Sequence, residues 1–283
     1  MNIPHDPNPE IVITRPDGAV GSMKLGDATD DTGNSPLVSC LMPTRGDPAI
    51  LRYALECYLN QDYQNRELIV VATDPSSELE ALLARSPQAN IRLVRVPASL
   101  TLGERRNASI AHAWGAWTCT WDDDDLYDPS RISMQLRAAR ASKTAAVFLS
   151  RMMVWWPAEK TMVVSKESAW EGTMLARRDV IPVYPALERH EDNWVVKAIR
   201  RFHPVSFLPT PALYCCTHTG KNTSGVEHVQ KMVREAEMTY QGQAYEDMLT
   251  SLAARLPIRQ YQSVLVALLL YFAAAQGFVQ RTI

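Results

Sequence analysis

Four consecutive aspartates, Asp122–Asp125, directly follow the apolar run Trp117–Trp121. Adjacent carboxylates repel one another, so they need a cation or solvent around them. Carboxylate oxygens suit a hard divalent ion such as Mg²⁺ or Mn²⁺. A bare acidic run is often only a solvated loop, but its place at the end of a strand favours a ligand site. The sequence therefore predicts a divalent metal site at Asp122–Asp125.

Three further segments carry residue types that could do chemistry. Gly103–Asn107 opens a predicted helix, where its arginines could bind an anion or simply face solvent. His190–Asn193 opens another helix, where a carboxylate either caps the helix or acts as a general base. His218–Ser224 follows an apolar strand, and His218 is a metal ligand, a phosphate contact or a structural histidine. Each segment alone leaves these alternatives open.

Strands and helices alternate through the segment that carries the aspartates. Buried strands are predicted at Leu37–Met42, Glu67–Ala72, Ile91–Val96 and Trp117–Trp121. Helices are predicted from Pro48 with Asp47 as N-cap, from Ser77 to about Arg85 with a Ser77–Glu80 capping box, over Gly103–Trp114, and from Pro129. This alternation predicts a mostly parallel sheet, with ligands beyond the carboxyl ends of its strands.

The alternation ends after about residue 144. Further β segments are predicted at Ala145–Val154, Thr161–Val164 and Ala212–Thr217, with a helix at Glu191–Arg201. Two helices are predicted after Val226, because Val226, Val229, Val233, Ala236 and Tyr240 follow a helical spacing. Residues 1–35 are rich in turn-forming residues and predict an arm or a small hairpin.

Composition excludes several classes of protein. The 283 residues hold 29 Lys plus Arg against 31 Asp plus Glu, and this net charge of −2 argues against a nucleic-acid binder. A hydrophobic content of 46% supports a sizeable core. Five cysteines without a CxxC pair indicate free thiols in a reducing compartment. We expect a cytoplasmic protein, with peripheral membrane contact as the alternative.

The longest apolar stretch is Val264–Ala275. It is shorter than the roughly 20 residues that a membrane-spanning helix needs, so no transmembrane segment is expected. It also lacks the basic face of an interfacial helix. We expect it to pack on the rest of the chain or to form a homodimer.

In their order along the chain, these segments resemble glycosyltransferase family 2 of the GT-A fold. The resemblance rests on Val38–Arg45, Glu67–Asp74, Gly103-x-x-Arg106-Asn107 with Ala113-x-Gly115, Asp122–Asp125 with Tyr127-x-Pro129-x-Arg131, Gly172–Arg178, Glu191-Asp192 and His218-x-Gly220-x-Asn222. It implies an α/β fold with a Rossmann-like, mostly parallel sheet, helices on both faces and additional C-terminal helices. It also implies a catalytic domain at 36–225, with a nucleotide-sugar half at about 36–130, an acceptor half at about 131–225 and a helical extension at 226–283.

The resemblance also implies roles for single residues. Asp122 and Asp124 correspond to the DXD motif, with Asp124 on the metal and Asp123 and Asp125 in support. His218 corresponds to a histidine that reaches the metal or the diphosphate. The nucleotide-sugar contacts implied in addition are Pro43, Thr44, Arg45, Asp74, Arg106, Asp122 and Asp123.

Catalysis in the family uses a carboxylate, and Asp192 corresponds to this general base with Glu191 beside it. The implied reaction is inverting transfer from a nucleotide-diphosphate sugar to a hydroxyl of a glycan, lipid-linked or other acceptor, as in polysaccharide biosynthesis. One departure concerns the nucleobase. Relatives carry two acidic residues after the second strand, and only Asp74, one position late, is available here to read uracil.

Two other functions compete with this interpretation. A metal-dependent sugar nucleotidyltransferase would share the sheet and the acidic ligands, but Pro43-Thr44-Arg45-Gly46 has only one of the glycines that its phosphate loop needs. A catalytically dead module that binds a sugar nucleotide or a glycan is the other alternative. The intact set of Asp122, Asp124, Asp192 and His218 argues against such a loss.

Overall fold

The computed structural model describes residues 6, 8–27, 35–220 and 222–267. Within these residues the large sheet has nine strands, in the spatial order β2 (Val20–Lys24), β1 (Glu10–Thr14), β12 (Val205–Leu208), β8 (Ala146–Leu149), β11 (Leu175–Arg177), β6 (Trp117–Thr120), β3 (Val38–Thr44), β4 (Arg66–Thr73) and β5 (Ile91–Val96). A smaller sheet follows the order β14 (Met238–Tyr240), β10 (Thr161–Val164), β9 (Met153–Trp156), β13 (Tyr214–Thr217) and β7 (Leu126–Tyr127).

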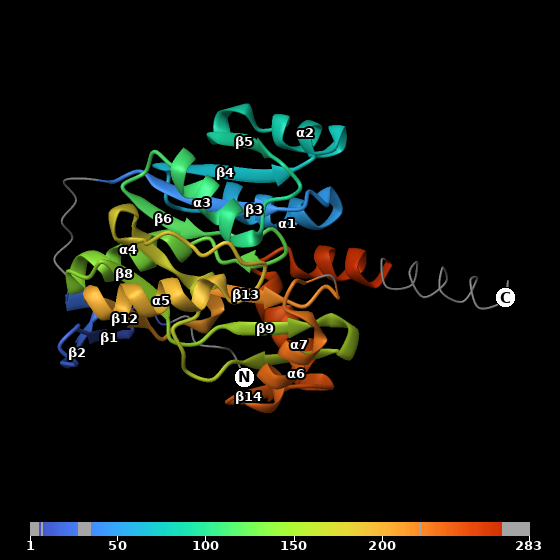
Figure 1. Ribbon diagram of the computed structural model, residues 1–283. Coiled ribbons are helices and arrows are strands. Elements are labelled where there is room, and N and C mark those ends of the chain that lie inside the picture. Colours follow the sequence, from blue (N-terminus) through green and yellow to red (C-terminus); the bar gives the residue numbers. More distant parts are fainter. Residues whose placement is uncertain (1–5, 7, 28–34, 221, 268–283) are drawn as a thin grey trace, which may run out of the picture.

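Helices connect and cover these strands. They are α1 (Pro48–Leu59), α2 (Ser77–Ala84), α3 (Leu102–His112), α4 (Arg131–Ser142), α5 (Glu191–Phe202), α6 (Gly225–Arg234) and α7 (Gln243–Ala253). Figure 1 shows β3, β4 and β6 side by side in the upper part of the molecule, with β9, β14, α6 and α7 in the lower part. The predicted α/β class is confirmed.

The four strands β6, β3, β4 and β5 are parallel, as the alternation predicts. Their side chains alternate between the two faces of the sheet. Leu41 and Ile69 pack on one face in a cluster that includes Ile110 of α3. Cys40 and Val70 belong to the main core, which includes buried residues of α1 and α2. Helices therefore cover both faces of this part of the sheet.

Beyond β6 the large sheet becomes mixed. β11 runs antiparallel to both β6 and β8, while β12 is parallel to β8. The predicted single β segment at residues 145–154 is wrong, because β8 and β9 belong to different sheets. The backbone of Ser150 still bonds to Leu208 at 3.1 Å, whereas Met153 pairs with Cys215 and Val164. The chain crosses between the sheets at this point.

The helix boundaries follow their caps. Thr101 and Glu104 form a complete capping box at the start of α3. Ser76 caps α2 by accepting from the N–H of Leu79 at 3.2 Å, so the predicted Ser77–Glu80 box is wrong by one residue. The predicted strand at Ile91–Val96 is confirmed at both ends.

Residues before and after the central part of the chain also join the two sheets. Residues 10–24 form the hairpin β1–β2, as predicted, and β1 pairs with β12 in the large sheet. The helix predicted from the spacing of Val226 to Tyr240 ends early, at Arg234. The prediction is wrong for Tyr240, which lies in β14 and pairs with Met162. Of the apolar stretch 264–275, residues 268–275 lie outside the described residues. None of the helices described is both long and apolar enough to cross a bilayer.

The start of α3 lies unusually close to the loop before α5. The N–H of Gly103 bonds to the carbonyl of Leu187 at 3.0 Å. A Cβ on Gly103 would stand 1.9 Å from the carbonyl oxygen of Pro185 and 3.3 Å from the Cβ of Glu191. Glycine is therefore required where the start of α3 meets the loop before α5.

We expect Gly103→Ala to lower the free energy of unfolding by about 1–3 kcal/mol, because the added methyl group must push the Pro185 backbone away. Urea unfolding measures this effect. Gly21→Ala is the matched control, since its Cβ would meet nothing closer than 3.9 Å and should cost less than about 0.5 kcal/mol. Equal stability of the two variants would show that the α3 contact is not tight.

Candidate active site

The carboxyl ends of three adjacent strands gather most of the predicted site residues. Thr44 and Arg45 stand at the end of β3, Asp74 follows β4, and Asp122–Asp125 follow β6 (Figure 1). Asp74 is exposed and adopts a left-handed backbone with φ of 49°. Parallel strands bring these loops to one edge, as the sequence predicts.

Pro43, expected to contact the nucleotide sugar, lies inside strand β3. It is buried within β3 and is in register with Val71 of β4. A proline is tolerated there because the pairing of β3 with β6 ends at Leu41, so no partner on that side needs its missing N–H. Pro43 therefore shapes the strand that leads into Thr44.

The four aspartates have four different environments. Asp123 accepts a hydrogen bond from the hydroxyl of Thr44. Asp124 accepts from the side-chain amide of Asn222 at 2.8 Å. Asp125 accepts from the hydroxyl of Tyr214 and from the N–H of Thr217. The remaining carboxylate, Asp122, stands 3.3 Å from the guanidinium of Arg106.

Burial and mutual repulsion disfavour the charged forms of this loop. Burial raises the pKa of Asp123 to about 6 and that of Asp125 to about 7, and repulsion from Asp122 adds to both. Burial and the three neighbouring aspartates raise the pKa of Asp124 well above its ordinary value. Carboxylate oxygens are the ligands that a hard divalent cation prefers, and the charge of such an ion would offset the repulsion among these aspartates.

Arg106 of α3 connects this loop to α5. Its guanidinium is buried and lies 3.1 Å from Glu191, 3.3 Å from Asp122 and 3.5 Å from Glu171. The hydroxyl of Tyr184 donates to Glu171 at 2.7 Å. Burial alone would lower the pKa of Arg106, but Glu171 and Asp122 hold it well above its ordinary value. Arg106, predicted to contact the nucleotide, is here the shared cation of three carboxylates.

The two acidic residues that open α5 have separate environments. Glu191 is buried against Arg106. Asp192 is half-buried, accepts the N–H of Asn193 at 2.8 Å and forms no ion pair with the residues that the structure describes. Of the two predicted catalytic carboxylates, Glu191 is therefore engaged in the network and Asp192 has oxygens available for a substrate.

His218 lies at the end of β13. The backbone N–H of His218 donates to the backbone carbonyl of Trp155 at 2.8 Å. The imidazole ring stands edge-on to the ring of Trp156, with centroids 5.6 Å apart. Burial, with a contribution from His228, lowers the pKa of His218. Within the described part of the chain no three His, Cys, Asp or Glu side chains form a metal-binding group. Asp122, Asp124 and His218 are therefore not preassembled as three ligands.

Glu188, in the loop before α5, carries no sequence signal that singles it out. Glu188 accepts from Arg45 at 2.5 Å, from Arg105 at 3.2 Å and from the N–H of Leu102 at 3.0 Å. The predicted nucleotide contact Arg45 is thus paired with a carboxylate of the loop before α5. Asn222 belongs to the motif His218-x-Gly220-x-Asn222, on which the resemblance partly rests. Its hydrogen bond to Asp124 joins residues far apart in sequence and forms because β13 places the loop after it beside the acidic loop.

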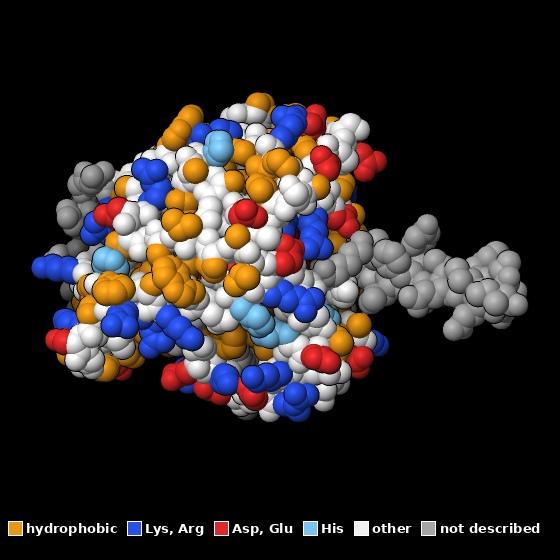
Figure 2. Space-filling view, viewed as in Figure 1, with side chains coloured by type: hydrophobic (Ala, Val, Ile, Leu, Met, Phe, Trp, Pro, Cys, Tyr) orange, Lys and Arg blue, Asp and Glu red, His pale blue; other side chains and the backbone are white. Residues whose placement is uncertain are grey.

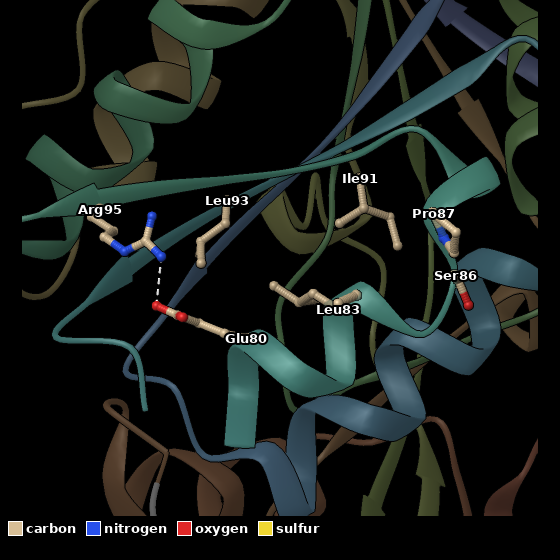
Figure 3. A pocket seen from close by; sticks show the side chains of 8 residues that line it. Glu80, Leu83, Ser86, Pro87, Ile91, Leu93 and Arg95 are labelled. Atoms are coloured by element: carbon tan, nitrogen blue, oxygen red, sulfur yellow. Dashed lines mark hydrogen bonds and ion pairs between the residues drawn. The ribbon is translucent and has the colours of Figure 1, made fainter. Parts of the chain in front are cut away.

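A hollow of about 300 Å³ lies elsewhere, between α2 and the edge strand β5. Figure 3 shows its apolar floor, formed by Leu83, Ile91 and Leu93, and the ion pair of Glu80 with Arg95 at its rim. No predicted site residue lines it. The candidate active site is therefore the edge with the aspartates, not this hollow.

We expect Arg106→Met to lower the free energy of unfolding by about 3–5 kcal/mol, because it leaves buried carboxylates without their cation. Arg45→Met is the matched control. Its ion pair with Glu188 is exposed and should contribute less than about 1 kcal/mol. Urea unfolding measures both variants, and similar losses would contradict the central place given to Arg106.

Known proteins share sequence and fold with this chain. Residues 39–196, more than half of the chain, match the model of glycosyl transferase family 2. The succinoglycan biosynthesis protein ExoO of Rhizobium meliloti (strain 1021) is 32% identical over 89 residues, which are 31% of this chain and 26% of ExoO. An uncharacterized glycosyltransferase of Haemophilus influenzae is 29% identical over 106 residues, 36% of this chain and 42% of that protein.

Solved structures share the fold. TarS (residues 1–349) of S. aureus, in complex with UDP-GlcNAc, aligns with a TM-score of 0.56 at 16% identity, over 71% of this chain and 67% of TarS. The mannosyltransferase PcManGT from Pyrobaculum calidifontis, in complex with GDP-Man and Mn²⁺, aligns with a TM-score of 0.50 at 16% identity, over 88% and 78%. The chain spans less than half the length of the curated relatives it matches. By its matched residues and its fold, the chain belongs to glycosyl transferase family 2.

Proposed function

We propose that this chain transfers a sugar from a nucleotide-diphosphate donor to an acceptor hydroxyl, with inversion at the anomeric carbon. The observation that carries the proposal is the double contact of Arg106 with Asp122 and Glu191. This contact ties the acidic loop to the helix that begins with Glu191 and Asp192. A donor held at the loop therefore lies beside a carboxylate that can serve the acceptor.

Asp122 and Asp124 are the residues we propose to hold Mg²⁺ or Mn²⁺. When bound, the ion supplies positive charge for the diphosphate leaving group. Thr44 orients Asp123, and Asn222 orients Asp124. His218, on the loop that carries Asn222, is proposed as a further contact to the metal or the diphosphate.

Asp192 is the proposed general base. In one step its carboxylate takes the proton of the acceptor hydroxyl, the acceptor oxygen bonds to the anomeric carbon, and the bond from that carbon to the diphosphate breaks. Entry of the acceptor oxygen opposite the leaving group inverts the centre. Glu191, fixed on Arg106, holds the start of α5 and thereby positions Asp192.

The donor base and the acceptor are proposed from the comparisons. The neighbours are solved with UDP-GlcNAc and with GDP-Man, so uridine and guanosine nucleotides are the first donors to test. Asp74 is the proposed base contact. ExoO bears the name of a succinoglycan biosynthesis protein, which favours a polysaccharide acceptor. Family 2 membership favours transfer over nucleotidyl transfer.

The surface next to Asp192 suits a glycan or a lipid-linked acceptor. Trp194, two residues after Asp192, is 54% exposed, and Phe202 at the other end of α5 is 66% exposed. Figure 2 shows hydrophobic side chains over α5, bordered by lysine and arginine. Exposed rings can stack on sugars, and a basic border can approach an anionic membrane surface. Peripheral membrane association is part of this proposal.

We expect Asp192→Asn to lower turnover by about 10²–10⁴-fold while nucleotide binding stays unchanged, because only the proton acceptor is removed. The measurement is the release of nucleoside diphosphate from UDP- and GDP-sugar donors, with water as acceptor where no glycan is supplied. Asp247→Asn is the control, since this exposed carboxylate of α7 bonds only within its helix.

Two results would count against the proposal in different ways. Near-normal turnover of Asp192→Asn would remove Asp192 from the role of base. If the unmodified chain bound nucleotide but released no nucleoside diphosphate from any donor, the chain would instead be a binding module.

A further inference from the structure

A buried aromatic cluster lies behind the acidic loop and includes Tyr261, which follows α7 along the chain. The ring of Tyr261 stacks on Tyr53 of α1 with centroids 4.6 Å apart, and it stands edge-on to Trp155 of β9 at 5.9 Å. Its relative exposure is 0%. Tyr261, 137 positions after Asp124 in the sequence, is thus a buried residue in contact with the acidic loop.

The hydroxyl of Tyr261 donates to the backbone carbonyl of Asp124 at 2.9 Å. This bond holds the main chain of the loop and leaves the carboxylate of Asp124 free for other partners. A second tyrosine acts in the same way, since Tyr127 donates to the carbonyl of Asp122 at 2.8 Å. Two phenolic hydroxyls therefore fix the backbone of alternate aspartates.

The same C-terminal segment, through Arg255, also binds Asp128, which follows the acidic loop. Arg255 donates two hydrogen bonds to the buried carboxylate of Asp128, at 2.5 and 2.7 Å. Burial alone would raise the pKa of Asp128, but the hydrogen bonds from Arg255 and Ser130 hold it below its ordinary value. Contacts of residues 255 and 261 thus bracket the segment from Asp124 to Asp128.

We propose that Tyr261 is a positioning residue for the metal-binding loop, so that the C-terminal segment completes the donor site. Four adjacent carboxylates repel one another, so the loop that carries them needs contacts that hold it in place. A hydrogen bond to the main chain holds the loop whether or not a ligand is present. The C-terminal segment with Tyr261 lies outside residues 39–196, which match the family model. The identity of the ligand rests on the proposed function.

Tyr261→Phe tests this by removing the hydroxyl and keeping the ring in its stack. We expect faster amide exchange with deuterium in the peptide that contains Asp122–Asp125. We also expect about tenfold weaker binding of Mn²⁺ in the presence of UDP or GDP, the cost of about one hydrogen bond. Both are measured well below the unfolding temperature, by exchange mass spectrometry and by titration calorimetry with MnCl₂.

Tyr245→Phe is the matched control. Its hydroxyl is also in the C-terminal segment and accepts from Trp155 at 3.0 Å, but it does not touch the acidic loop. We expect this variant to lose stability without faster exchange at Asp122–Asp125. A merely structural role of Tyr261 would make the two variants alike.

Each outcome decides a different point. Unchanged loop exchange in Tyr261→Phe, or an equal change in Tyr245→Phe, would overturn the positioning role. Faster loop exchange in Tyr261→Phe would support that role even if the unmodified chain bound no nucleotide with Mn²⁺. That last result would count against the proposed function alone.

Discussion

Repulsion within Asp122–Asp125 is the constraint around which the described site is arranged. The loop carries one carboxylate at every position, and burial raises the pKa of three of them. Each neighbouring element contributes a donor that holds one aspartate in place: Thr44 from β3, Asn222 from the loop after β13, and Tyr214 from β13. These donors are uncharged and leave the negative charge of the aspartates in place. A divalent ion bound to the loop would compensate that charge.

Arg106 extends this arrangement to the start of α5. One buried guanidinium serves Asp122, Glu171 and Glu191, so the loop after β6 and the start of α5 share a cation. Removing any one of these three carboxylates would change the environment of the other two. The close approach at Gly103 and the pairing of Arg45 with Glu188 connect α3 and the end of β3 to the loop before α5. The site is therefore a junction between segments rather than a single loop.

The sequence predicts the parts of this site that are local. Buried apolar runs predict β3, β4, β5 and β6, and the ends of parallel strands predict where Asp122–Asp125 must lie. Resemblance to a family predicts Asp192 as the general base, but only the fold shows that Glu191 and not Asp192 is paired with Arg106. The spacing that suggests one helix up to Tyr240 fails because the edge of β10 offers a strand partner. The role of Tyr261 depends on a contact between residues 137 positions apart, which no local pattern encodes.

The most direct test of the account is a thermal-unfolding panel of the unmodified chain with UDP-, GDP-, dTDP- and CMP-sugars, each with Mn²⁺ and with EDTA. A ligand that binds only the folded state raises the unfolding temperature by mass action. The account predicts a rise with one nucleotide class that requires Mn²⁺ and exceeds the effect of Mn²⁺ alone. The absence of any rise, or an equal rise in EDTA, would contradict the claim that the acidic loop holds a metal-bound nucleotide sugar.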